Sequence, residues 1–189
     1  MKRESHKILG NYLMEQLQEL PAYRYQKAFL LGCIEPDSNP LTYLKGSRSI
    51  QWLRGHNYRN AERWIGSTCG KLEARETWRL LDYYRLGKLI HYTSDAFTFA
   101  HNETFLEDIR AHRSYEAKLQ RYFKTTLALQ YNAESQQCYD SVMAAIEAAH
   151  DRYMEAATSI ATDVTYILEM AGQVFASLIP QPEPTVALA

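Results

Sequence analysis

The chain has 189 residues, of which 46% are hydrophobic and 23% are charged, a composition that indicates one soluble globular domain with a sizeable core. Its net charge of -1 argues against a basic nucleic-acid-binding protein, and no stable nucleic-acid complex is expected. The three cysteines, Cys33, Cys69 and Cys138, form no CxxC pair and are predicted to be small buried residues. The polar amino-terminal segment is unlike a signal peptide and no apolar stretch reaches the length of a membrane span, so the expected compartment is the cytoplasm.

Apolar residues at helical spacing predict an all-α protein with no strands. An irregular region over 36–56, rich in proline, glycine and asparagine, interrupts this pattern and has a length typical of functional loops. We expect a single-domain bundle of six or seven helices over 1–179, followed by a flexible proline-rich tail over 180–189. Helices are predicted over 5–18, 21–34, 58–73, 76–100 and 103–131, and 134–178 forms one very long helix or two in series.

Two histidines are each followed four residues later by a carboxylate: His91 by Asp95, and His112 by Glu116. Residues i and i+4 share a helix face, so each pair can reach one metal ion. We expect the two pairs to lie on neighbouring antiparallel helices and to converge on one pocket, with His101 near the break between the helices.

Further candidate ligands come from the amino-terminal part of the chain: His6, and Asp37 and His56 in the irregular region. Histidine nitrogen and carboxylate oxygen without cysteine are typical of catalytic zinc sites. Each candidate ligand is weak evidence by itself; Asp37, for example, follows a proline and could be an ordinary turn residue. The prediction depends on the pattern of all the candidates together. His150 has only Asp151 beside it, which faces elsewhere, and is predicted not to bind metal.

The spacing His91-x-x-x-Asp95-x5-His101, followed by His112-x-x-x-Glu116, resembles that of the zinc-dependent phospholipase C family. His6, Asp37 and His56 fall in the order that this family uses, and the resemblance covers roughly residues 6–120. It implies the all-α bundle of that family, whose fold the S1/P1-type nucleases share, and a cluster of two or three Zn2+ ions per chain.

The resemblance also implies roles for individual residues. Asp37, His56, His91 and Asp95 would hold one zinc, and His101, His112 and Glu116 a second. His6 would help to hold a third zinc, with Asp95 as a bridge, and Asp37 would also orient or deprotonate the attacking water as the catalytic residue. Secreted members complete the third site with an amino-terminal tryptophan, whereas this chain starts with Met1. Either the Met1 amine replaces it, or the third metal is weakly held or missing.

The basic stretch between Lys45 and Arg63 surrounds His56. It makes Arg48, Arg54 and Arg59 candidates for binding a substrate phosphate or head group, or alternatively a solvated charged face. The aromatic residues Tyr43, Trp52 and Tyr58 could stack on a base or a cation, or simply pack. The leading hypothesis is a zinc-dependent phosphodiesterase acting on a phosphodiester, with a phospholipid as one candidate substrate. The alternatives are a nuclease or nucleotide phosphatase on the same fold, and a zinc-binding protein without catalysis.

Overall fold

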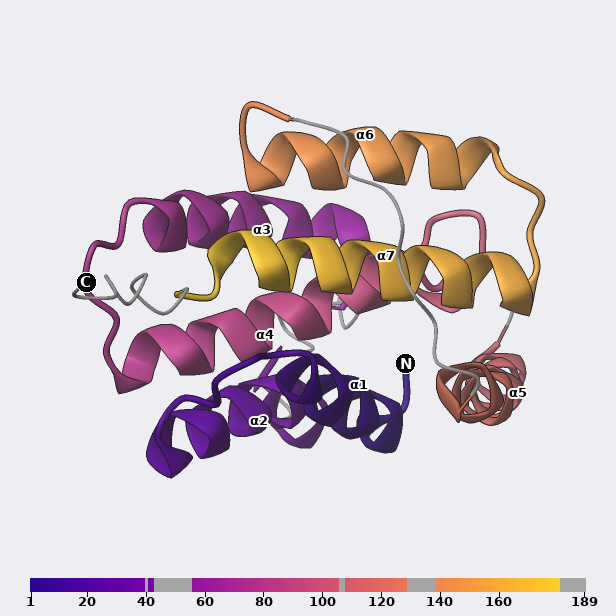
Figure 1. The fold of residues 1–189 in the computed structure, drawn as a ribbon. Coiled ribbons are helices and arrows are strands. Elements are labelled where there is room, and N and C mark those ends of the chain that lie inside the picture. The colour runs from indigo at the N-terminus through magenta and orange to yellow at the C-terminus, as the bar shows by residue number, and fades with distance from the viewer. Residues whose placement is uncertain (40, 43–55, 106–107, 129–138, 181–189) are drawn as a thin grey trace, which may run out of the picture.

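The computed structural model describes residues 1–189 except 40, 43–55, 106–107, 129–138 and 181–189. Within these residues it contains helices and no strand, so the predicted all-α class is confirmed (Figure 1). The helices are α1 (Arg3–Glu15), α2 (Tyr23–Ser38), α3 (Tyr58–Glu73), α4 (Leu80–Ala96), α5 (Ile109–Ala128), α6 (Val142–Glu155) and α7 (Ile160–Leu178), with the short 3-10 helix η2 (Phe99–His101) after α4.

The predicted boundaries are correct for α3 and differ elsewhere. The segment predicted as a helix over 76–100 forms α4 from Leu80 onward and turns into η2 after Ala96. The two-helix alternative holds for the segment 134–178, in which α6 and α7 are each preceded by a serine that caps the helix. Ser141 Oγ accepts a hydrogen bond from the Ala144 amide and Ser159 Oγ from the Thr162 amide, which satisfies an otherwise unpaired first-turn donor.

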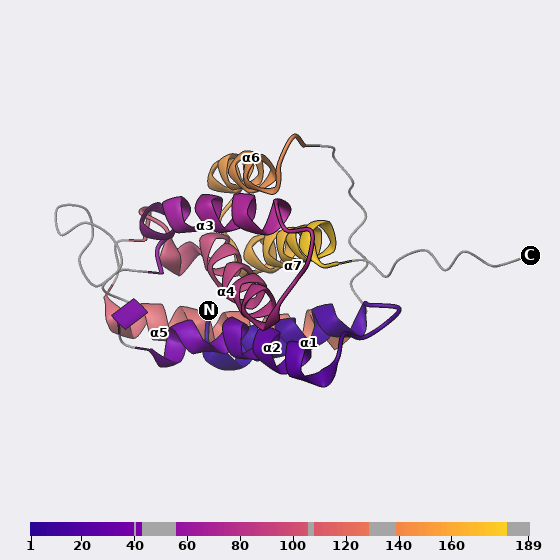
Figure 2. The same ribbon diagram turned by 90° about the vertical axis from the view of Figure 1, so that its left-hand side faces the viewer.

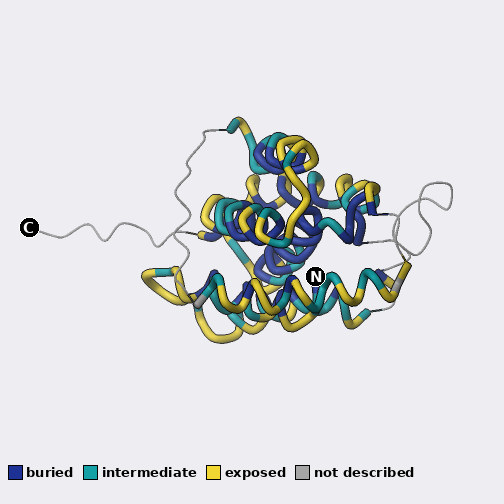
Figure 3. The backbone as a smooth tube through the Cα atoms, turned by 90° about the vertical axis from the view of Figure 1, so that its right-hand side faces the viewer, coloured by how far each residue is buried: buried dark blue, intermediate teal, exposed yellow. Residues whose placement is uncertain are grey.

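Helix α4 is the centre of the bundle and packs against α2 on one side and against α3 and α7 on others (Figure 2). From Leu89 to Thr98 every residue of α4 and of the turn that follows is buried, the longest such run in the part of the chain that the structure describes. Figure 3 shows the buried, dark blue segments gathered at the centre of the bundle. Polar side chains on this segment therefore face other protein groups rather than bulk water.

Helices α2 and α4 run parallel and touch through their backbones. The Tyr25 and Tyr83 rings stack at 4.7 Å, and further along the His91 ring lies 2.9 Å from the Cys33 carbonyl. Gly32 on α2 and Gly87 on α4 allow the close approach. A Cβ atom on Gly87 would lie 2.9 Å from the Cys33 amide nitrogen and closer still to the Phe29 carbonyl oxygen. This crossing brings the carboxy-terminal ends of both helices to the same place.

The expected irregular region begins later than predicted. Pro36 lies inside α2, which continues to Ser38, so Asp37 stands on the last helical turn rather than in a loop. Proline has no amide hydrogen to donate within the helix, yet α2 continues through Pro36 to Ser38. The expected antiparallel arrangement is also wrong: α5 runs across the bundle and is seen end-on in Figure 1, where α4 lies along the page.

Cys33 and Cys69 are buried and form no disulfide, as expected, whereas Cys138 lies outside the described residues. Among the described helices, none is long and apolar enough to cross a membrane. The tail over 180–189 falls almost wholly outside the described residues, so its flexibility stays a prediction, as does the cytoplasmic location.

Candidate metal centre

Eight histidine and carboxylate side chains gather where α2 and α4 end and α1 begins. The structure brings all eight residues singled out from the sequence into three groups, in each of which one ligand atom per residue lies within 4.8 Å of the others. The groups are His6, His91 and Asp95; Asp37, His56 and His91; and His101, His112 and Glu116.

Three donor atoms around His56 have the spacing of neighbouring ligands in a tetrahedral zinc site, and a fourth lies close to two of them. Ligands about 2.0–2.1 Å from a tetrahedral zinc lie about 3.3 Å from one another. His56 Nδ1 lies 3.3 Å from His91 Nε2, and Asp95 Oδ2 lies 3.2 Å and 3.3 Å from these two atoms. Asp37 Oδ1 completes the set at 3.7 Å from each histidine nitrogen. The donor set and its spacing fit zinc.

The two oxygens of Asp95 face different neighbours. Oδ2 belongs to the set around His56, whereas Oδ1 lies 3.3 Å from His6 Nε2 and against the Met1 amine. His6 in turn stacks on the His91 ring at 3.8 Å. Asp95 is thus placed to bridge two adjacent cations, as the family resemblance implies.

The group of His101, His112 and Glu116 joins η2 to α5. Glu116 Oε1 lies 3.4 Å from both His101 Nε2 and His112 Nε2. His112 and Glu116 share one face of α5 through their four-residue spacing, and His101 reaches them from the turn after α4. His101 Nδ1 also lies 3.7 Å from Asp95 Oδ2, which makes this group contiguous with the other two.

Two hydrogen bonds fix which ring nitrogens face the centre. The Cys33 carbonyl can only accept, so His91 Nδ1 donates to it at 2.9 Å and the Nε2 lone pair points to the ligand group. Thr42 Oγ1 donates its proton to a backbone carbonyl, that of Pro36 at 2.6 Å, so it accepts from His56 Nε2 at 3.1 Å. His56 Nδ1 then faces the centre unprotonated. No sequence pattern singles out Thr42, because its role depends on a contact with His56, fourteen residues away.

The electrostatics of the metal-free site favour forms that bind cations. Burial lowers the pKa of His6 well below its usual range and also lowers the pKa of His101. Burial alone would raise the pKa of Asp95, but His101, the Met1 ammonium and His91 lower it well below its usual range. Neutral imidazoles beside an ionised carboxylate are the protonation states that metal binding requires.

Several buried atoms of the centre are unsatisfied by the protein. His6 Nε2, Asp37 Oδ2 and His101 Nδ1 are buried and make no hydrogen bond to any residue that the structure describes. Leaving such atoms unpaired costs about 1–3 kcal/mol each, so a group of them in one place calls for a further partner. A cation with its bound waters would supply one.

The Met1 amine lies within the centre. It forms an ion pair with Asp95 and lies 3.2 Å from His101 Nε2 and 3.4 Å from Glu116 Oε1. Burial alone would lower the pKa of this amine, but the carboxylates of Asp95, Glu116 and Asp37 together raise it to about 10. Carboxylates that hold a buried ammonium also favour a metal cation at the same place.

Only one of the predicted substrate-binding residues is described: Arg48 and Arg54 lie outside the described residues, as do Tyr43 and Trp52. Arg59 is exposed and pairs with Glu103 at 2.6 Å. Both line a pocket of about 300 Å³ that opens beside His101 and that Tyr58 also lines.

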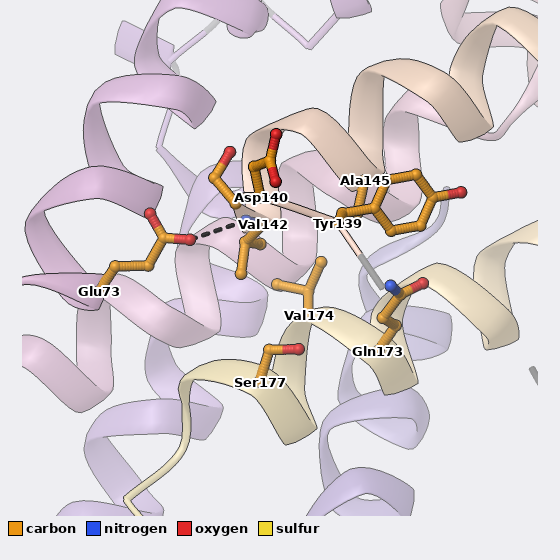
Figure 4. A pocket seen from close by; sticks show the side chains of 9 residues that line it. Glu73, Tyr139, Asp140, Val142, Ala145, Gln173, Val174 and Ser177 are labelled. Atoms are coloured by element: carbon orange, nitrogen blue, oxygen red, sulfur yellow. Dashed lines mark hydrogen bonds between the residues drawn. The ribbon is translucent and has the colours of Figure 1, made fainter. Parts of the chain in front are cut away.

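His150 lines the same pocket as His101 but belongs to none of the ligand groups, and a second pocket lies apart from them. His150 Nε2 is hydrogen-bonded to the Asn102 side chain at 2.9 Å and its ring stacks on Tyr58, so it packs rather than joining a metal group. A pocket of about 360 Å³ between α3, α6 and α7 contains none of the candidate ligands. There Glu73 accepts a hydrogen bond from the Val142 amide and caps α6 (Figure 4).

Comparison with known proteins agrees with this geometry. The family model described as "Zinc dependent phospholipase C" matches residues 5–160, which includes all eight ligand candidates. No curated protein and no solved structure matches the chain.

Proposed function

Since this chain belongs to the zinc-dependent phospholipase C family, we propose that it is a zinc-dependent hydrolase that cleaves a phosphodiester through a cluster of two or three zinc ions. The observation that supports this most is the set of four donor atoms at 3.2–3.7 Å around His56, with Asp95 shared between neighbouring groups. A single structural zinc would need neither the bridge nor the third group of ligands.

We assign one zinc to Asp37, His56, His91 and Asp95, and a second to His101, His112 and Glu116. His6 and Asp95 hold a third, with the Met1 amine in reach of the same oxygen. When bound, zinc ions in such a cluster polarise a phosphoryl oxygen and lower the pKa of a bound water to about 7.

The exposure of the ligands indicates the side from which substrate approaches. The side chains of His6, His91 and Asp95 are fully buried, whereas His112 is 30% exposed and Asp37 is 12% exposed. The buried ligands therefore form the back of the centre. The phosphodiester reaches it from the side of Asp37 and His112.

Asp37 is the proposed catalytic residue. Its carboxylate stands on the accessible side of the centre, and burial raises its pKa, with Asp95 acting in the same direction and His91 opposing. Zinc ions beside it would keep this carboxylate ionised, so Asp37 would orient the attacking water and accept its proton.

We assign the leaving group of the substrate to the pocket beside His101. Arg59 lies at the edge of this pocket, where it can exchange its pairing with Glu103 for a substrate phosphate. The Tyr58 ring lines the same pocket and offers an aromatic surface to a head group or a base.

The first experiment is to measure zinc in the purified protein by elemental mass spectrometry and then assay hydrolysis of bis(4-nitrophenyl) phosphate. We expect two to three zinc ions per chain and phosphodiester hydrolysis that a chelator abolishes and zinc restores. Less than one zinc per chain after reconstitution would overturn the proposal. Full zinc content without hydrolysis of this ester, of phospholipid or of nucleotide esters would support the non-catalytic alternative.

The same assay separates the substrate alternatives. Faster hydrolysis of phosphatidylcholine vesicles than of dinucleotides would support a phospholipase C. The reverse order would support the nuclease or nucleotide phosphatase alternative on this fold.

A further inference from the structure

Asp163, on the first turn of α7, is a buried carboxylate outside the ligand groups. It is fully buried, and its oxygens accept three hydrogen bonds. Oδ2 accepts from the Phe99 amide at 2.9 Å and from the Tyr115 hydroxyl at 2.8 Å, and Oδ1 accepts from the Tyr153 hydroxyl at 2.8 Å.

The three donors come from three different elements. Phe99 begins η2, which ends at the ligand His101, and Tyr115 stands next to the ligand Glu116 on α5. Tyr153 belongs to α6. One side chain of α7 therefore ties together the two segments that carry His101 and Glu116, and fixes both to the rest of the bundle.

We propose that Asp163 is a positioning residue for the second zinc site, holding η2 against α5 so that His101, His112 and Glu116 converge. The inference rests on the proposed function, because it presupposes that this group binds zinc. Asp163 does not touch the ligands and acts through the backbone of η2 and through Tyr115.

The geometry explains why a carboxylate is needed at this position. Two hydroxyls and one amide all point hydrogen atoms at Asp163, and only a group with two acceptor oxygens satisfies all three. The Phe99 and Tyr115 rings also pack at 5.8 Å. The elements η2 and α5 are therefore held together both by their hydrogen bonds to Asp163 and by this contact between two aromatic rings. In Asp163→Asn, an NH2 group replaces one carboxylate oxygen and faces one of these donors. The lost hydrogen bond allows η2 and α5 to separate.

The test compares zinc affinity in Asp163→Asn and wild-type protein by chelator competition. Loss of a residue that orients metal ligands typically weakens metal binding by about 10–100-fold, and we expect a weakening of this size for one zinc ion only. In the metal-free variant, hydrogen exchange at the Phe99 amide should become faster, a readout that does not depend on zinc or activity. Tyr115→Phe removes the α5 link alone and should weaken the same zinc ion to a smaller degree, which keeps the proposal testable if Asp163→Asn does not fold.

A matched control and a double-mutant cycle separate positioning from general destabilisation. Asp82 is also a buried first-turn aspartate that accepts hydrogen bonds, but at the start of α4. Asp82→Asn should lower stability and leave the affinity for every zinc ion unchanged. In a Glu116→Ala background Asp163→Asn should cause no further zinc loss, whereas in a His91→Ala background the two effects should add.

Wild-type zinc affinity in both Asp163→Asn and Tyr115→Phe would overturn the inference, as would an effect that adds to that of Glu116→Ala. Absence of zinc from the wild-type protein would instead refute the proposed function itself.

Discussion

Replacing Gly87 by alanine tests whether the backbone contact between α2 and α4 sets the geometry of the metal centre. A Cβ atom at this position would lie 2.9 Å from the Cys33 amide nitrogen, whereas ordinary contacts begin at 3.4 Å, so the helices must separate by at least about 0.5 Å. Asp37 lies on α2 and His91 on α4, with 3.7 Å between their donor atoms. Metal sites tolerate errors of only about 0.2 Å in ligand distance.

We therefore expect Gly87→Ala to lower the free energy of unfolding by about 1–3 kcal/mol, the usual cost of overpacking, and to weaken zinc binding. Chemical denaturation of the metal-free protein and chelator competition measure the two effects. Gly172→Ala in α7 is the matched control, because a Cβ there has no neighbour within 4 Å. It should raise stability by up to about 1 kcal/mol and leave zinc binding unchanged. If Gly87→Ala behaves like Gly172→Ala on both measurements, the close crossing does not position the ligands.

Three further changes test the site from other directions. His91→Ala and Glu116→Ala should each lower the zinc content by one ion per chain or more in elemental analysis, and full zinc in either variant would refute that ligand assignment. Thr42→Val removes the acceptor of the His56 Nε2 proton and should weaken zinc binding about 10-fold in chelator competition, whereas Thr42→Ser should restore it. Burial lowers the pKa of His150 to about 4 from 6.5, so the unfolded chain binds a proton that the folded chain rejects between these values. Stability should fall as the pH drops from about 6.5 to about 4, by an amount on the order of 3 kcal/mol. His150→Ala should reduce this dependence and keep the zinc content unchanged, and an unaltered pH dependence would contradict it.

The sequence predicts best what lies within one helix. The amphipathic pattern of 58–73 predicts both ends of α3 correctly. The four-residue spacing correctly places His91 beside Asp95, at 3.3 Å, and His112 beside Glu116, at 3.4 Å. These contacts follow from helix geometry alone, whatever the helix packs against.

Turns and crossings were predicted less well, because they depend on residues distant in sequence. Proline at position 36 favours an end to the helix there, but α2 continues to Ser38, and the Pro36 carbonyl accepts a hydrogen bond from Thr42. The direction of α5 depends on packing against α7 and η2, which periodicity does not encode. Asp163 had no spacing signal either, since its donors lie ten to sixty-four residues away.

The ligand groups meet because one buried segment serves all three. His91 and Asp95 at the end of α4, and His101 at the end of η2, supply at least one ligand to every group. Each remaining ligand comes from another element and reaches this segment across a contact between elements: His6 reaches Asp95 at 3.3 Å and Glu116 reaches His101 at 3.4 Å. A change that moves one outer helix should therefore affect the one group it serves. A change that moves the end of α4 should affect them all. Gly87→Ala, which displaces α4 against α2, and Asp163→Asn, which acts on the group of His101, therefore make separable predictions about zinc affinity.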